Sequence, residues 1–182
     1  MQVIGYNAVN MIEIIIDDVT YHVPDDMGNR YRQMVAEWEA KGNTIPPYTV
    51  PLNIKIDTKV AELEAHGQSL FNQGFAYDFG KPYGVLHLQM RNDSDKANWL
   101  VARMNMNDAI MAGYGDERIA PIHTAENITV MVTPKEGVNV LVAMNAWGMH
   151  LYSKSWEKKA EIRALESEDA LNDYDVTEGW DV

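Results

Sequence analysis

The sequence predicts an α+β protein in which a small N-terminal module, a β-hairpin plus one helix, precedes a larger C-terminal domain. In that domain we expect a β-hairpin packed with two or three helices, the last one long. Two short runs rich in β-branched and aromatic residues are each interrupted by turn residues, and apolar residues recur at helical spacing in several longer segments. Between the two parts, Asn43–Pro51 holds three of the seven prolines, which is typical of a semi-rigid spacer.

These signals divide the chain into a docking module at residues 1–50, a linker helix at residues 51–66 and an α+β domain at residues 67–182. A hairpin with one amphipathic helix buries little surface. We therefore expect the module to dock on another surface rather than to be stable alone.

The N-terminal module begins with "MIEIIIDDVTYHVP", which predicts two short strands joined at Asp17-Asp18. A helix follows, with Asp25 or Asp26 as its N-terminal cap and Gly42 after its C-terminal end. The apolar stripe of this helix consists of Met27, Tyr31, Met34, Val35 and Trp38.

The linker helix is predicted to end at Gly67, with Leu63 facing inward. The hairpin of the C-terminal domain follows, because apolar and polar residues alternate on both sides of a turn at Gly80–Gly84. A helix then follows, with Asp93 or Ser94 as its N-terminal cap, and ends at Gly113 and Gly115. The face of this helix that we expect to be buried consists of Leu100, Met104, Asn107, Met111 and Tyr114.

A strand at Asn127–Thr133 leads into the last helix, which begins with Thr133 as cap, a proline at the first position and Glu136 three residues after the cap. The helix is predicted to run to about Leu165. Its expected buried side consists of Val138, Leu141, Val142, Met149, Tyr152 and Trp156.

The composition excludes several classes of function. A net charge of −12 argues against binding nucleic acid through its phosphates, which needs clustered Lys and Arg. Without cysteine the chain has no disulfide and no thiolate chemistry. Its first residues lack the pattern of a signal peptide, and the apolar run Met11–Ile16 is far shorter than the roughly 20 residues that cross a bilayer. We expect no membrane association.

No pattern in the sequence predicts a catalytic or metal site. The five histidines are scattered and none is paired at zinc-motif spacing. The glycine-rich stretch Ala112–Arg118 follows a helix and lacks the Lys-Ser/Thr of a phosphate loop. The chain is therefore predicted to be no enzyme and to need no cofactor or metal.

Three side chains are the candidate partner-binding residues. Trp99 and Met106 lie off the expected core stripe of their helix, and Trp180 follows an acidic segment at the end of the sequence. The segment "YDVTEGW" either inserts into a partner or folds back, and we expect it to fold back with Tyr174 and Trp180 packing near the hairpin. Burial of the tryptophan ring favours this by about 2 kcal/mol.

Two stretches resemble proteins of tailed bacteriophages. The first, "DDVTYHVPDDMGNRYRQMVAEWEAKGNTIPPY", resembles the opening module of small tailed-phage proteins. The second runs from "GFAYDFGKPYGVLHLQMRNDSDKANW" through "ITVMVTPKEG" to "YDVTEGW" and is similar to an uncharacterised domain at the C-termini of tail-fibre and tail-assembly proteins. This chain departs from that domain at Val132, where leucine is common.

The resemblance implies a non-enzymatic bacteriophage tail protein that binds a tail-fibre or baseplate subunit, as a structural virion component or as a fibre-assembly chaperone. It would then be found in the virion tail, or in the host cytoplasm during assembly, as an oligomer or in a hetero-complex. Two alternatives remain open at this point: a fibre-associated hydrolase of the host surface, which would need paired carboxylates in a cleft, and an acidic regulatory or anti-defence protein.

Overall fold

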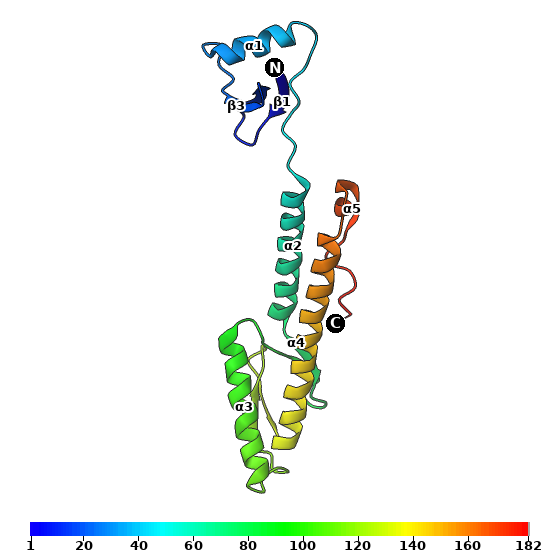
Figure 1. Cartoon of the computed structure of the whole chain (residues 1–182). Helices are drawn as coiled ribbons and strands as arrows, with labels where there is room; N and C mark the ends of the chain where they lie inside the picture. The colour runs from blue at the N-terminus through cyan, green and yellow to red at the C-terminus, as the bar shows by residue number, and fades with distance from the viewer. Residues whose placement is uncertain (182) are drawn as a thin grey trace. The chain divides into compact units, whose positions relative to one another are not determined.

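The computed structural model describes residues 1–181 and confirms the α+β class (Figure 1). The chain divides into two compact units, Met1–Lys55 and a second unit that begins at Ile56. Within residues 1–181 no helix is both long enough and apolar enough to cross a membrane.

Unit 1 is a three-stranded antiparallel sheet covered by one helix. Its strands β1 (Gln2–Tyr6), β2 (Ile12–Ile16) and β3 (Val19–Val23) pair in the order β1-β2-β3, and α1 spans Arg30–Glu39. The predicted hairpin is β2–β3, and its turn residues Asp17 and Asp18 adopt positive φ of 51° and 62°. This is the geometry that a two-residue hairpin turn requires. Strand β1 was not predicted.

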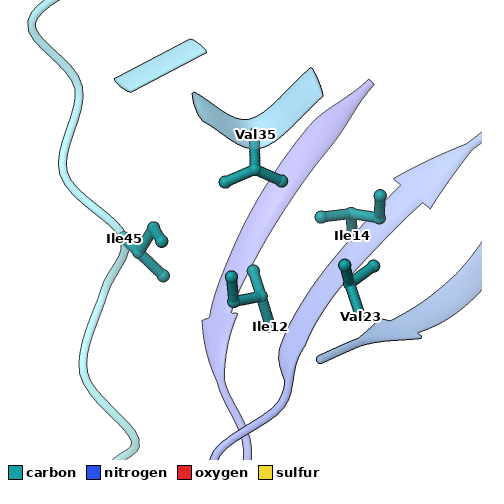
Figure 2. Close-up of a cluster of buried hydrophobic side chains, with 5 residues drawn as sticks. All are labelled: Ile12, Ile14, Val23, Val35 and Ile45. Carbon is teal, nitrogen blue, oxygen red and sulfur yellow. The ribbon is translucent and has the colours of Figure 1, made fainter. Parts of the chain in front are cut away.

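The core of unit 1 is a cluster of five aliphatic side chains, which Figure 2 shows pointing toward one another from the sheet, the helix and the segment after the helix. The cluster consists of Ile12, Ile14, Val23, Val35 and Ile45. The prediction that Val35 is on the inner side of its helix is confirmed, whereas Met27 lies before the helix and is exposed.

Helix α1 begins later than predicted. Its N-terminal cap is Asn29, whose side-chain oxygen accepts hydrogen bonds from the backbone amides of Tyr31 and Arg32. Asp26 instead accepts from the backbone amide of Gly28 in the turn that precedes the helix. The aspartates were wrong as caps because this turn moves the helix start three residues along the chain.

Unit 2 alternates helices with two separate β-hairpins. Helix α2 spans Leu52–Gln73, so its first residues precede the unit boundary, and α3 spans Asp93–Met111. The first hairpin pairs β4 (Phe75–Asp78) with β5 (Val85–Leu88), and the second pairs β6 (Ala120–His123) with β7 (Thr129–Val132). Helices α4 (Pro134–Arg163) and α5 (Glu168–Asp173) complete the unit.

The linker helix was predicted too short. Helix α2 continues through Gly67 and ends at Gln73, just before Gly74, which has a φ of 87°. Gly67 faces the ring of Trp180, so its small size serves packing rather than termination. Leu63 is fully buried, as predicted.

The starts of α3 and α4 show the strength of local capping signals. The cap of α3 is Asn92, which accepts from the backbone amide of Asp95, rather than the predicted Asp93 or Ser94. At α4 the predicted capping box is confirmed, because Thr133 and Glu136 each bond the backbone amide of the other.

Candidate protein-binding surface

Helix α3 exposes a stripe of apolar residues to solvent. Leu100 is 61% exposed, Met104 57% and Met111 83%. We call this face the α3 stripe; it consists of Ala97, Leu100, Met104, Asn107 and Met111, all exposed, and Tyr114 continues it in the following turn. The sequence predicted this face to be buried, and that prediction was wrong.

The opposite side of α3 packs on α4, through small residues and Met106. Met106 is only 4% exposed. A Cβ atom built on Gly137 of α4 would lie 2.6 Å from its Sδ atom. The absence of a side chain at Gly137 therefore lets the two helices approach closely, with Met106 between them. Figure 1 shows α3 and α4 side by side along this contact.

Helix α4 exposes a second apolar stripe. We call it the α4 stripe; it consists of Val142, Asn145, Met149, Tyr152 and Trp156. Met149 is 52% exposed and Trp156 61%. Four of these residues were predicted to be buried, and for them the prediction was wrong, whereas it is confirmed for Leu141. The buried residues of α4 include Val140, Leu141, Met144, Gly148, Leu151 and Ile162.

A shallow apolar groove of about 200 Å³ lies between the two stripes. Buried Met90, Leu141 and Met144 are among the side chains that line it, together with Leu100 of the α3 stripe and Met149 of the α4 stripe. The groove and the stripes therefore form one continuous surface with a concave centre, a common geometry for protein recognition.

Lys96 and Tyr152 are the polar groups at one end of the groove. The Lys96 Nζ atom donates a hydrogen bond of 3.1 Å to the Tyr152 hydroxyl. This bond is the main reason that the pKa of Lys96 is raised. The ammonium group also lies 5.8 Å from the ring centres of Phe71 and Tyr152. Lys96 Nζ also lies 3.7 Å from the exposed Asp93 carboxylate, so this end of the groove holds an ion pair bordered by aromatic rings.

The structure brings only one of the three predicted partner-binding residues to this surface. Trp99 is half-buried, lines the groove and donates its indole N–H to the backbone carbonyl of Gln89 at 2.7 Å. Met106 and Trp180 are buried within unit 2, so the folded chain does not present them on its surface.

Met149, Tyr152 and Trp156 were missed as surface candidates, although their three- and four-residue spacing beside Gly148 was visible in the sequence.

The C-terminal segment folds back onto its own domain. Trp180 is 3% exposed, its indole N–H donates to the carbonyl of Val176 at 2.8 Å, and its ring centre lies 5.4 Å from that of His66. The Nε2 atom of His150 donates a hydrogen bond to the carbonyl oxygen of Trp180 at 2.9 Å. The contacts are with α2 and α4, not with the β4–β5 hairpin as predicted.

Tyr174 anchors the same segment on α4. Its hydroxyl donates to the Glu161 carboxylate at 2.5 Å, and the Lys158 ammonium lies 5.4 Å from its ring centre. Burial, and then the bond to Glu161, raise the pKa of Tyr174 above its ordinary value.

A hydrogen-bonded clamp joins the two hairpins of unit 2. Glu126 accepts from the backbone amide of His87 at 3.1 Å and from its ring Nδ1 at 2.8 Å, while the Ala125 amide donates to the His87 carbonyl at 2.8 Å. The bond from the His87 side chain is the main cause that lowers the pKa of Glu126 to about 2. The clamp is structural, because both groups are used in joining β5 to the turn before β7.

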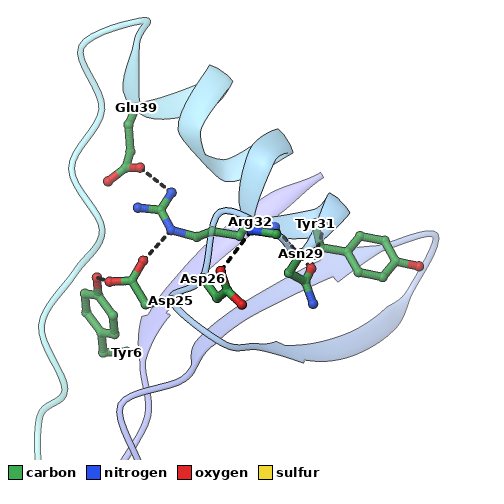
Figure 3. A network of polar contacts seen from close by, with 8 residues as sticks. Tyr6, Asp25, Asp26, Asn29, Tyr31, Arg32 and Glu39 are labelled. Carbon is green, nitrogen blue, oxygen red and sulfur yellow. Dashed lines mark hydrogen bonds and ion pairs between the residues drawn. The ribbon is translucent and has the colours of Figure 1, made fainter.

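Unit 1 contains one charged network, shown in Figure 3. Arg32 bonds the carboxylates of Asp25 and, at 2.7 Å, Glu39, and Tyr6 donates to Asp25 at 3.1 Å. The bond from Arg32 holds the pKa of Asp25 below its usual range. This network connects β1 and the loop before α1 to the helix. We therefore interpret it as a structural network that stabilises unit 1.

Other hollows offer no comparable constellation. One of them, about 450 Å³, lies beside the β4–β5 turn and is lined by Tyr77, Tyr83, Arg118 and Glu136 among others. Arg118 donates to the Met131 carbonyl and lies 3.7 Å from Glu136, so it already has partners. Within residues 1–181 no group of three or more His, Asp and Glu side chains is placed to hold a metal ion.

One family matches the chain. It is described as a domain of unknown function (DUF4376), and the match covers residues 54–177. No curated protein and no solved structure matches.

Proposed function

We propose that this chain, which belongs to the DUF4376 family, is a non-enzymatic bacteriophage tail protein that binds a tail-fibre or baseplate subunit. The observation that carries the proposal is the groove between α3 and α4, together with the exposed α4 stripe. The resemblance of two stretches of the sequence to tailed-phage proteins supplies the biological setting.

The chemistry of the surface favours a helical partner segment. When an amphipathic helix binds in a groove, its apolar side chains at three- and four-residue spacing are buried against the groove. Met149, Tyr152 and Trp156 of the α4 stripe are spaced in the same way, so they can contact successive side chains of such a helix. Tryptophan and tyrosine are enriched among residues that dominate binding energy. Lys96 at the end of the groove bonds Tyr152 and pairs with Asp93, and because an ammonium group has three donors it can also bind a carboxylate, or the carbonyl end of a helix, on the partner.

Binding can be tested with tail-fibre and baseplate proteins of the proposed bacteriophage. Each is co-expressed with the full chain, and complexes are purified and their affinity measured by calorimetry. Met149→Glu places a charge in the contact and is expected to weaken binding by at least about tenfold. Met131→Glu is the matched control, because Met131 is 40% exposed on β7, outside the groove and both stripes. Equal affinities of the two variants, or no complex with any tail protein, would contradict the proposal.

The role in the phage life cycle is a separate question with its own measurement. Mass spectrometry of purified mature particles would detect a structural component of the tail. Absence from mature particles, combined with a complex in lysates of infected cells, would indicate an assembly chaperone in the host cytoplasm.

A further inference from the structure

The α3 stripe has the spacing of a coiled-coil seam. Its members follow one another at intervals of three, four, three and four residues from Ala97 to Met111. This alternation keeps a single line of side chains facing one partner helix when two helices supercoil with a left-handed twist. The side of α3 that packs on α4 is a different one, so the seam is unoccupied within the described chain.

The seam also has a polar member. Asn107 is exposed between Met104 and Met111. In a pair of identical helices in register, each Asn107 amide lies opposite the same amide of the other copy and can exchange a hydrogen bond with it, so that no polar group of the seam is buried unpaired. This favours a second copy of the chain over an unrelated apolar partner.

Charges on the two flanks of the seam select the orientation. Arg103 and Asp108 are exposed on opposite sides of the stripe. Arg103 and Asp108 are five residues apart in the sequence. In a parallel coiled coil, a residue on one flank of the seam faces the residue five positions later on the opposite flank of the partner helix. In a parallel pair each Arg103 would face Asp108 of the other copy, whereas antiparallel pairing would bring like charges together.

We propose that the α3 stripe binds the α3 stripe of a second copy of this chain, in parallel and in register, with Arg103 of each copy facing Asp108 of the other. This self-association does not require the proposed binding of a tail protein, which is centred on the groove and the α4 stripe. The two surfaces adjoin at Leu100 and Arg103, which both line the groove, so one dimer presents two grooves.

Sedimentation equilibrium of the full chain, over a concentration series that extends into the millimolar range, is the first test. The wild type is expected to form a dimer. Met104→Glu should abolish it throughout that range, because it places two charges in an apolar seam. Met131→Glu should dimerise like the wild type. A wild type that stays monomeric, or a dimer that survives Met104→Glu, would overturn the proposal.

Charge reversal tests the parallel register and does not depend on the fold tolerating a seam mutation. Arg103→Asp alone and Asp108→Arg alone should each raise the dimer dissociation constant by about tenfold, since each creates two like-charge contacts. The double variant should restore the wild-type constant. Because residues five apart do not meet on one helix, rescue requires a second copy. Failure of the rescue would overturn the parallel register.

Discussion

Replacement of Trp180 by alanine should lower the stability of unit 2 by about 3 kcal/mol. Removal of a buried tryptophan side chain costs roughly 3–5 kcal/mol, and Trp180 is 3% exposed against Gly67 and His66. We place the cost at the lower end because the bond from His150 goes to the backbone carbonyl of residue 180, which the variant retains. For a unit of this size, the expected fall in the melting temperature is roughly 10 °C.

Calorimetry and urea unfolding followed by circular dichroism can measure this loss, with Trp156→Ala as the matched control. Trp156 is 61% exposed and stacks only on Tyr152, at 6.3 Å between ring centres. Its removal should cost at most about 1 kcal/mol. If Trp180→Ala costs no more than Trp156→Ala, the C-terminal segment does not fold back onto its own domain, and the competing idea of a partner-inserted segment gains support.

The contact with Gly67 supplies an internal check on the same reasoning. A Cβ atom at this position would lie 3.2 Å from Cη2 of Trp180, closer than a relaxed contact. Gly67→Ala improves helix propensity by about 0.5–1 kcal/mol, but in the wild type this gain is opposed by the crowded ring. In a Trp180→Ala background the full gain should appear. A double-mutant cycle with no coupling between the two sites would refute the packing.

Three further outcomes are expected. Gly137→Ala should destabilise unit 2 by about 1–3 kcal/mol in urea unfolding, because the new methyl group meets Met106 Sδ at 2.6 Å in a packed interface; an unchanged midpoint would refute this close approach. Glu126→Gln should lower the free energy of unfolding by about 1 kcal/mol at pH 7; the effect is small because the Glu126 side chain is 35% exposed and solvent screens its interaction with His87. Since the folded pKa of Glu126, about 2, lies below its ordinary 4.5, this difference should be present above pH 4.5 and vanish as the pH falls toward 2; a difference that persists at pH 2 would exclude the clamp with His87. Residues 1–55 expressed alone should lack a cooperative thermal transition, because so small a unit buries little surface; a sharp transition with dispersed NMR signals would show an independent domain.

Local signals in the sequence were sufficient for several elements of the fold. The Asp17-Asp18 turn and the Thr133–Glu136 capping box were identified because their chemistry acts over four residues or fewer. Strand β6 was missed because its formation does not depend on local signals. Pro121 within it weakens the local strand pattern, and the segment is a strand because it pairs with β7.

The burial of the helix faces could not be predicted, because periodicity reveals a stripe but not what covers it. On α3, the apolar stripe through Leu100 and Met104 gave the stronger pattern, yet Met106 is the residue that packs on α4. The deciding feature is Gly137, about thirty residues away in the sequence, which allows the close approach. Long-range complementarity of this kind leaves no mark within a single helix. The same holds for Trp180, whose neighbours on α2 and α4 were not predictable from the segment itself.

Coverage of the exposed stripes by other protein can be measured directly by methionine oxidation followed by mass spectrometry. Oxidation of methionine follows solvent exposure, so the isolated chain at low concentration should react rapidly at Met104, Met111, Met149 and Met131 and slowly at buried Met106. In tail complexes purified from infected bacteria, Met104, Met111 and Met149 should be protected while Met131 remains reactive. If Met104, Met111, Met149 and Met131 are each oxidised equally in the isolated chain and in the complex, the assignment of α3 and α4 as binding surfaces is contradicted.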